Sequence, residues 1–380
     1  MEQQQATQIV CEQCQHTTTI PVLQHRQRAV CPQCGHTLLT FRHNAIENTL
    51  AYSLSALVFM LLSLPFNFLS FRASGQQHTI NLPGGLKVLI ENDYLSLAII
   101  TGLATLVLPG TLLIGLICLT LASLYNYRPP FLRRVHLWVT RLMPWSMAEI
   151  FLVGTLVSLT KITAMAEVSI GMSFYAFIGF TVCMTASLFY FDRDRMALWI
   201  YEGNPPAPAP LSAQAASYSI QRTWALLATA TLLYIPANML PIMHTEYFGR
   251  DEPSTIVGGA ITLWQSGSYP IALVILFASV AVPVVKILIL AWLNFSVQQG
   301  HLYSQNSRIR YYRITEWIGR WSMIDVFVVA ILVALIQLGN AISIYPGPAA
   351  LAFCAVVFIT MIAAMSFDSR LIWLSRKQYQ

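Results

Sequence analysis

The stretch VFVVAILVALIQLGNAISIYPGPAALAFCAVVFITMIAAMSF, from Val326 to Phe367, contains 42 residues and no Asp, Glu, Lys or Arg. A helix crosses a bilayer with about 20 mainly apolar residues, so this run is too long for one crossing and long enough for two. Pro346, Gly347 and Pro348 lie near its middle, and proline and glycine favour a turn there. The stretch therefore predicts two membrane spans joined by a turn.

The composition of the whole chain also indicates a membrane protein. Its 380 residues are 56% hydrophobic and only 10% charged, and the mean hydropathy is +0.58. Soluble globular proteins carry roughly 25% charged residues, so the soluble enzyme classes are excluded. The net charge of +6 does not indicate a nucleic-acid partner, because the basic residues are spread between apolar runs. The first residues form no apolar signal segment, and we expect them in the cytosol.

Long apolar stretches predict eight membrane spans. They cover residues 48–71, 94–124, 144–166, 171–191, 222–243, 269–295, 321–341 and 348–367. Lys and Arg favour cytoplasmic connections. With a cytosolic N-terminus, seventeen of them lie inside and three, Arg72, Lys87 and Arg250, lie outside. This asymmetry predicts that both termini are cytosolic.

The chain contains an internal repeat. WSMAEIF at 145–151 matches WSMIDVF at 321–327, and LPFN at 64–67 matches IPAN at 235–238. Each half has four spans, an even number, so both halves enter the membrane in the same direction. We therefore predict an all-α polytopic membrane protein made of two parallel four-helix repeats, with the two halves meeting at a cleft.

The repeat divides the chain into four segments. Residues 1–43 precede the spans, and residues 44–202 and 221–380 contain the two membrane repeats. Residues 203–220, with GNPPAPAPLSAQAAS at their start, form a Pro/Ala linker of semi-rigid character. The outside loops 72–93 and 244–268 are long enough to form small strands.

Four of the seven cysteines form a metal-binding pattern. Cys11 and Cys14 make one C-x-x-C pair, and Cys31 and Cys34 make a second pair sixteen residues later. Two such turns present four thiolates to a tetrahedral Zn²⁺, and Gly35 suits the positive φ that these turns commonly take. The alternatives are disulfides, which a reducing cytosol disfavours, and a redox pair, which lacks its βαβ context. We predict a small cytosolic zinc ribbon that holds one structural zinc.

These motifs resemble those of the paraquat-inducible protein A family. The resemblance rests on the cysteine pattern, LPFN at 64–67, the loop from PSTI to GSYP at 253–270, and GRWSMIDVF at 319–327, and it extends over nearly the whole chain. It implies an inner-membrane protein of a Gram-negative envelope, with tetraspanin-like four-helix repeats. It also implies transport of phospholipid or other amphiphiles to or from a periplasmic partner with mammalian-cell-entry (MCE) domains. Many relatives have a second cysteine ribbon between the halves, but residues 200–222 contain no cysteine, so one zinc is expected.

Ionisable residues inside the expected spans are candidates for transport, because a charge in lipid is costly. The candidates are Asp325, Lys286, Glu149 and Lys161, together with Arg320 and Ser322 of the repeat motif. Glu149 and Asp325 are equivalent, and an interfacial ion pair with a nearby arginine is the alternative to a transport role. Lys161 approaches the outer face, where snorkelling explains it equally well.

Lys286 distinguishes the two halves, because its equivalent in the first half is Leu112. Antiparallel packing of the sixth and seventh spans brings Lys286 towards Asp325. We put this pair forward as a hypothesis for proton coupling, since burial raises the pKa of a carboxyl group and a neighbouring cation limits the rise.

Several residues of the repeat are assigned structural roles. They are Pro65, Asn67, Pro236, Asn238, Trp145 and Trp321. Each asparagine follows a proline by two residues, and we expect its amide to satisfy a carbonyl that the kink frees. FLRRVHLW at 131–138 is basic and amphipathic, which suits an interfacial helix on anionic lipid.

No catalytic motif is present: the sequence has no Walker pattern, no Gly-x-Ser-x-Gly and no His-Glu-x-x-His. We therefore expect a protein that is not an enzyme and has no nucleotide motor of its own. The leading interpretation is the lipid-handling protein that the resemblance implies. The alternatives are a proton-coupled secondary transporter of small solutes and a membrane stress sensor or scaffold whose ribbon binds a cytosolic partner.

Overall fold

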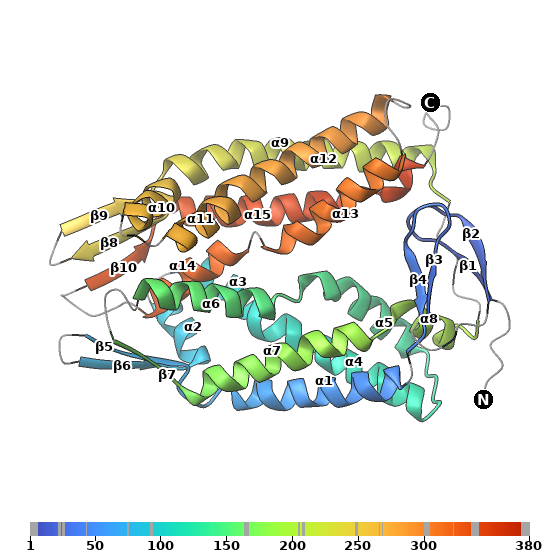
Figure 1. The fold of residues 1–380 in the computed structure, drawn as a ribbon, viewed down its shortest axis with the longest axis horizontal. Coiled ribbons are helices and arrows are strands. Elements are labelled where there is room, and N and C mark those ends of the chain that lie inside the picture. The colour runs from blue at the N-terminus through green and yellow to red at the C-terminus, as the bar shows by residue number, and fades with distance from the viewer. Residues whose placement is uncertain are drawn as a thin grey trace.

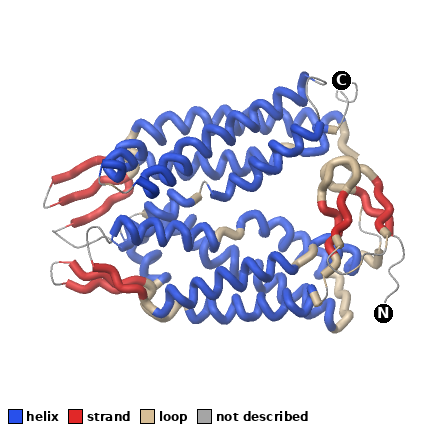
Figure 2. Tube along the Cα trace, viewed as in Figure 1, coloured by secondary structure: helices blue, strands red, loops and turns tan. Residues whose placement is uncertain are grey.

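The chain is a mostly helical bundle with small β-structures at both ends (Figure 1, Figure 2). The computed structural model describes residues 7–373, apart from 22–23, 25–26, 43, 74–75, 92–93, 163–166, 204–205, 207–209, 248–249, 266, 268, 300–304, 322 and 336–341. The cysteine hairpins are β1 (Thr7–Val10) with β2 (Thr17–Ile20), and β3 (Arg28–Val30) with β4 (Thr37–Thr40). They lie at one end of the bundle, and two three-stranded sheets project from the other (Figure 2).

The two halves have the same order of elements. The first consists of α1 (Ala45–Leu62), β5 (Leu69–Ala73), β6 (Gln76–Ile80), α2 (Leu82–Glu91), α3 (Leu95–Gly102), the π-helical η1 (Leu103–Val107), α4 (Leu108–Leu124), α5 (Phe131–Leu142), the 3-10 helix η2 (Met143–Trp145), α6 (Ala148–Ile162), β7 (Glu167–Ile170), α7 (Met172–Tyr190) and α8 (Arg193–Ile200). The second consists of α9 (Ala213–Met239), β8 (Met243–Tyr247), β9 (Arg250–Ser254), α10 (Ile256–Gln265), α11 (Tyr269–Leu276), the π-helical η3 (Phe277–Ala281), α12 (Val282–Gln299), α13 (Gln305–Trp321), α14 (Ile324–Leu335), β10 (Ile342–Pro346), α15 (Pro348–Ser366) and the 3-10 helix η4 (Ser369–Ile372). The repeat in the sequence thus corresponds to a repeat of the fold.

Six helical stretches among the described residues are long and apolar enough to cross a membrane. They are Ala45–Leu62, Leu95–Leu124, Phe131–Leu159, Met172–Tyr190, Phe277–Gln299 and Pro348–Ser366. Two of the eight expected spans are not in this set. α9 covers the fifth expected span, but Arg222, Asn238 and several threonines lower its hydropathy, and the described α14 has only 12 residues. The chain is therefore a multi-pass membrane protein with six spans of clear character.

The small sheets differ from the expectation in where their strands begin. Strands were expected within 72–93 and 244–268, but β5 begins at Leu69 and β8 at Met243. Each of these strands is central, in the orders β6-β5-β7 and β10-β8-β9. The third strands come from short segments between spans, where Ile342-Ser343-Ile344 shows the alternation of a strand. The turn expected at 346–348 therefore joins a strand to a helix, and not two helices.

Two equivalent glycines join these sheets to the fourth span of each half. The Gly171 amide donates to the Phe68 carbonyl, at 3.1 Å, and the Gly347 amide donates to the Ile242 carbonyl, at 2.8 Å. A Cβ on either glycine would overlap the backbone of Asn67 or Pro241. Only glycine permits such a close approach of two backbones, so this contact fixes where α7 and α15 begin.

A helix break lies at the Trp-Ser-Met motif, at the start of the third expected span of each half. In the first half, η2 and the extended backbone of Ser146 (φ −73°, ψ 111°) separate α5 from α6. Pro144 in η2 lacks an amide donor, which weakens the helical hydrogen-bond ladder there. In the second half, α13 ends at Trp321 and α14 begins at Ile324. The motif therefore marks a helix break on both sides of the molecule.

The two halves meet mainly through α6 and α14 (Figure 1). The rings of Phe151 and Phe327 meet edge to face with centroids 5.5 Å apart, and Ser158 Oγ donates to the Val328 carbonyl at 3.5 Å. Among the described residues, the buried core therefore extends across both halves at this contact. α1 packs against α4 and α7 of its own half, as expected.

The repeats differ at their prolines. α1 ends at Leu62, before Pro65, whereas α9 continues through Pro236. The Asn238 amide donates to the Tyr234 carbonyl at 2.9 Å, whereas the carbonyl that loses its helical donor at Pro236 belongs to Leu232. α9 also begins earlier than expected, at Ala213, because the Ser212 hydroxyl caps it by accepting from the Ala215 amide. The end of the expected linker, 203–220, is thus helical.

Candidate metal centre and the cavities beneath it

Each cysteine pair lies in a tight turn between two strands. In the second turn, the Cys31 amide donates to the His36 carbonyl, and the Gly35 amide donates to the Cys31 carbonyl, both at 2.8 Å. The first turn repeats both contacts. Gly35 has a φ of 67°, which confirms the expected positive φ, and Gln15 has a φ of 59° at the equivalent position. The paired turns direct all four thiols towards one point.

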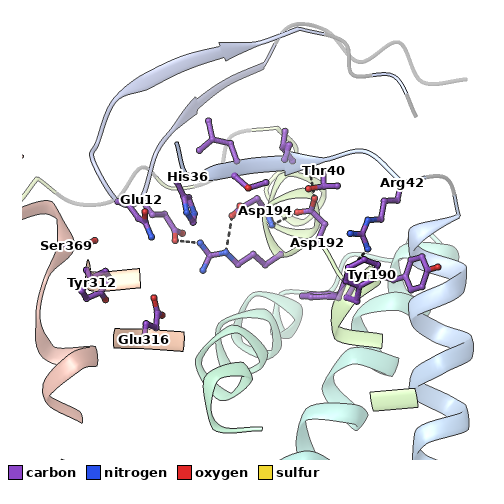
Figure 3. A pocket seen from close by; sticks show the side chains of 17 residues that line it. Glu12, His36, Thr40, Arg42, Tyr190, Asp192, Asp194, Tyr312, Glu316 and Ser369 are labelled. Carbon is purple, nitrogen blue, oxygen red and sulfur yellow. Dashed lines mark hydrogen bonds and ion pairs between the residues drawn. The ribbon is translucent and has the colours of Figure 1, made fainter. Parts of the chain in front are cut away.

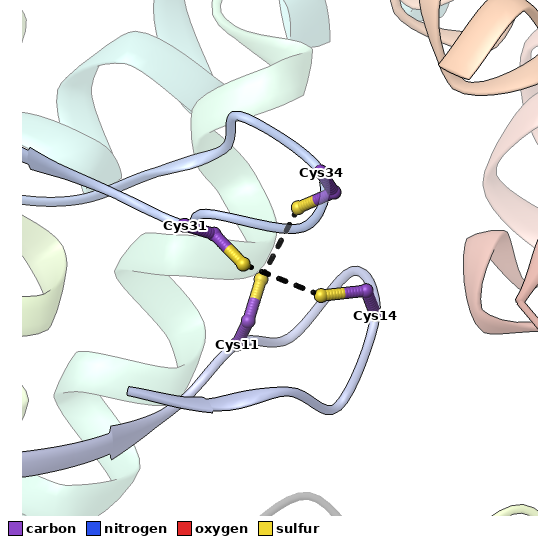
Figure 4. Close-up of side chains that lie close together, drawn as sticks. All are labelled: Cys11, Cys14, Cys31 and Cys34. Carbon is purple, nitrogen blue, oxygen red and sulfur yellow. Dashed lines mark hydrogen bonds between the residues drawn. The ribbon is translucent and has the colours of Figure 1, made fainter. Parts of the chain in front are cut away.

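The four sulfur atoms converge at this point (Figure 4). Cys11 Sγ lies 3.6 Å from Cys34 Sγ, and Cys14 Sγ lies 3.5 Å from Cys31 Sγ. All four ligand atoms lie within 4.8 Å of one another, and all four residues are buried. Tetrahedral Zn–S bonds of about 2.3 Å place sulfurs about 3.8 Å apart, whereas a disulfide requires about 2.05 Å. The donor set fits one tetrahedral metal ion, and it does not fit disulfides.

The surroundings of the site distinguish the cysteines from the nearby histidines. Burial raises the pKa of the Cys11 thiol to about 11, and a divalent cation offsets this effect because it stabilises the thiolate. His36 instead lines a cavity (Figure 3). Burial and the charges of Arg193 and Arg313 lower its pKa to about 4. The cluster of close ligand atoms among the described residues contains the four cysteines and neither His16 nor His36.

The hairpins contact both halves of the membrane bundle. Arg193, at the start of α8, donates to Glu12 Oε2 at 2.6 Å. Arg313, on α13, donates to Gln13 Oε1 at 2.7 Å and to the Cys34 carbonyl at 3.0 Å. Glu12 and Gln13 lie between the ligands Cys11 and Cys14. The metal-binding turn thus bridges α8 of the first half and α13 of the second.

A cavity of about 460 Å³ lies beneath the hairpins (Figure 3). Its walls come from the hairpins, from the end of α7 and the start of α8, and from Tyr312 and Glu316 of the second half. Asp194 faces it, and burial raises the pKa of this carboxyl group to about 7, although Arg193 Nε, 3.6 Å away, opposes the rise. No sequence pattern predicts this cavity, because its lining residues come from three distant segments.

Lys286 is buried in the second half. It is 2% exposed, and no described residue offers its Nζ a hydrogen bond. Leu112, its equivalent, is 1% exposed in the apolar core of the first half. Glu149 lies in the first turn of α6 and is half-buried. The structure therefore places Lys286 inside the protein, away from lipid.

Several other candidates are placed only by their backbone. Lys161 and Asp325 lie on α6 and α14. Their side chains, those of Arg320 and Trp321, and the whole of Ser322 lie outside the described residues. The pairing of Lys286 with Asp325 therefore stays a hypothesis.

Two matched residues of the repeat have roles that sequence reasoning missed. Asp192 Oδ1 accepts from the backbone amides of Asp194 and Arg195, both at 3.1 Å, and so caps α8. Asp368 Oδ1 accepts from the Arg370 amide at 3.0 Å and caps η4. An aspartate directly before a short helical segment is the signal that identifies such a cap.

Trp145 stacks on Phe358 of the other half with ring centroids 6.0 Å apart.

Comparison with known proteins covers almost the whole chain. The family model described as Paraquat-inducible protein A matches residues 46–200 and 220–377, which are the two halves. The intermembrane transport protein PqiA of Escherichia coli (strain K12) is 37% identical over 407 residues, which cover 97% of this chain and 96% of that protein. A probable intermembrane transport protein of Haemophilus influenzae is 29% identical over 400 residues, 96% of this chain and 95% of that protein.

A third relative is the lipophilic envelope-spanning tunnel protein A of Escherichia coli (strain K12). It is 26% identical over 390 residues, which cover 96% of this chain and 90% of that protein. No solved structure shows a significant match. Because the family model covers both halves and the PqiA relative is similar over nearly its whole length, the chain belongs to the paraquat-inducible protein A family.

Proposed function

We propose that this chain is the inner-membrane component of an envelope lipid-transport system, which moves phospholipid or other amphiphiles between the inner membrane and a periplasmic tunnel of MCE-domain protein. The observation that carries the proposal is the similarity, over both halves, to proteins named for intermembrane transport and for a lipophilic envelope-spanning tunnel. Long apolar helices and cavities between the halves support it. Transport, and not catalysis, is the role that these names describe.

The proposed topology has eight crossings in two parallel, tetraspanin-like repeats, at residues 44–202 and 221–380, joined by the segment 203–220. Both termini are cytosolic, so the sheets project into the periplasm. The excess of Lys and Arg in the hairpin-side connections supports this orientation. Cysteines placed singly in the β5–β6 and β8–β9 turns test it. A membrane-impermeant maleimide should label both in intact cells from which the outer membrane has been removed, and protection of either turn would contradict the topology.

The cysteine hairpins are proposed to be a zinc ribbon with one structural Zn²⁺. The four buried sulfurs support this, because their separations suit a tetrahedral ion and four thiolates leave no ligand position for water. Metal analysis of the pure protein should give one zinc per chain. Cys31→Ser should remove it and unfold the ribbon while the helices still insert, since the ribbon depends on its metal. A chain without zinc, or with two, would contradict the proposal.

Transfer of lipid between vesicles tests the function directly. The purified chain is reconstituted in donor vesicles with a fluorescent phospholipid, and an MCE-domain partner connects them to acceptor vesicles. We expect transfer that requires both proteins, and protein-free donor vesicles serve as the control. Uptake of small solutes driven by a pH gradient, without lipid transfer, would replace the proposal with a secondary transporter. Absence of both activities would favour a sensor or scaffold.

A further inference from the structure

A second cavity, of about 430 Å³, lies between the two halves and adjoins the one beneath the hairpins, because both are lined by Tyr312 and Glu316. Leu188 of the first half and Met361 of the second contribute to its apolar walls, and Lys286 lines it as well. The volume is within the range of small-molecule sites, roughly 300–1,000 Å³. The cavity thus combines an apolar wall with a cation.

The Lys286 ammonium group has no partner among the described residues that line this cavity. None of the described residues offers its Nζ an acceptor, although only 2% of the residue is exposed. The group also lies against Gly319 of α13, where a Cβ would be 3.1 Å from Nζ. A buried charge without a counter-ion is strongly unfavourable. The fold itself does not require this charge, because Leu112 occupies the equivalent position in the first half.

The other charged residues of the cavity wall are accounted for. The Arg313 guanidinium donates to Gln13 and to the Cys34 carbonyl of the ribbon. Glu316 is exposed, so its carboxylate keeps its hydration. Among the described residues that line the cavity, Lys286 is therefore the buried cation that has no anionic partner.

We propose that this cavity binds the phosphodiester of a phospholipid head group, with the Lys286 ammonium as its counter-ion; the inference rests on the proposed lipid transport. An ammonium is a compact charge that suits phosphate oxygens. The flexible methionine Met361 and the side chain of Leu188 adapt to the apolar part of the lipid. The site joins both halves, so a bound lipid contacts each of them.

Thermal unfolding of the full-length protein in a non-ionic detergent tests the site, because a ligand that binds the folded state raises Tm. The probes are dioctanoyl-phosphatidylglycerol, dioctanoylglycerol and inorganic phosphate. We expect the phosphatidylglycerol to bind wild type at least ten-fold more tightly than dioctanoylglycerol, about 1.4 kcal/mol. Lys286→Met should abolish this difference. Lys87→Met is the control, because Lys87 is exposed and paired with Glu91 on α2.

Two further measurements distinguish a loss of lipid binding from a folding defect. Lys286→Met should raise the Tm of the lipid-free protein, since it removes an unpaired buried charge. Gly319→Ala keeps the lysine but crowds its Nζ, so it should weaken phosphatidylglycerol binding several-fold. A lower lipid-free Tm for Lys286→Met would overturn the proposal, because it would show that Lys286 has a protein partner such as Asp325.

Other outcomes overturn the site in distinct ways. Equal affinity of wild type for the two lipids, or unchanged phosphatidylglycerol binding by Lys286→Met, excludes phosphate recognition. Displacement of the lipid by an equal concentration of inorganic phosphate makes free phosphate the ligand and excludes the lipid. Lys286-dependent binding without lipid transfer contradicts the proposed function and leaves the site in place. Transfer that Lys286→Met leaves unchanged contradicts the site and leaves the function in place.

Discussion

The two halves of the chain have the same order of elements, but they differ in what they bury. Both have a π-helical segment before Pro109 or Pro283, and both begin the fourth span at a glycine that touches a neighbouring backbone. At the equivalent positions 112 and 286, the first half has a leucine in its core and the second has a buried lysine. The features that the halves share therefore set the scaffold, and the candidate ligand-binding chemistry lies where the halves differ.

The largest expected effect comes from making the first half resemble the second. Leu112→Lys places an ammonium in an apolar core at a position that is 1% exposed, and an uncompensated buried charge costs about 3–5 kcal/mol. We expect a large decrease in Tm and a lower yield of expressed protein. Lys286→Leu, the converse change, should raise Tm. If Leu112→Lys is as stable as wild type, positions 112 and 286 tolerate a buried ammonium group equally well, and the contrast between the halves is wrong.

The glycine contacts should respond alike in both halves. Gly171→Ala and Gly347→Ala each force a Cβ onto a carbonyl-bearing backbone, and such overpacking costs about 1–3 kcal/mol. Equal losses of Tm in the two variants would support the equivalence of the halves. Gly259→Ala, which meets no atom within 4 Å, is the control. A loss in one half alone would show that the two sheets are anchored differently.

Much of this comparison is visible in the sequence. The repeat motif and the apolar runs predicted the helical halves, and the C-x-x-C spacing predicted the cysteine cluster. The helix break at Ser146 and the strand at Ile342–Pro346 were missed, because an apolar run has the same composition in a helix, a break or a buried strand. The cavities were not predictable, since long-range packing brings segments as distant as Glu12 and Glu316 together.

The prolines offer a smaller contrast. Pro236 lies inside α9, so Pro236→Ala restores an amide donor for the Leu232 carbonyl and should stabilise the helix by about 1–3 kcal/mol. Pro65 lies beyond the end of α1, so Pro65→Ala should change stability by less than about 0.5 kcal/mol. Thermal unfolding of the two variants measures the difference. Equal shifts would mean that Pro65 also constrains a helix.

The smallest effect is a pH dependence at Asp194, in the first turn of α8 in the first half. Burial raises the pKa of Asp194 to about 7 in the folded protein, whereas an unfolded Asp has a pKa of about 3.9. The folded state thus binds a proton more tightly, and stability falls as the pH rises from about 4 to 7 and then levels off. Between pH 6 and pH 8 we expect a loss below about 1 kcal/mol at this partly exposed site. Asp194→Asn should remove this dependence, and an unchanged profile would refute the assignment.

The role of Lys286 in lipid transfer is tested most directly by substitutions at the two matched positions, measured in the vesicle transfer assay. Lys286→Met and Leu112→Met both place a methionine at the same position of the repeat. A substitution that acts only by disturbing the fold should therefore lower the transfer rate in both variants. We expect at least a ten-fold loss of the transfer rate for Lys286→Met, about 1.4 kcal/mol. For Leu112→Met we expect a rate within about two-fold of wild type, since exchanges of similar volume are tolerated. Equal rates for the two variants, whether both lost or both retained, would contradict this role of Lys286.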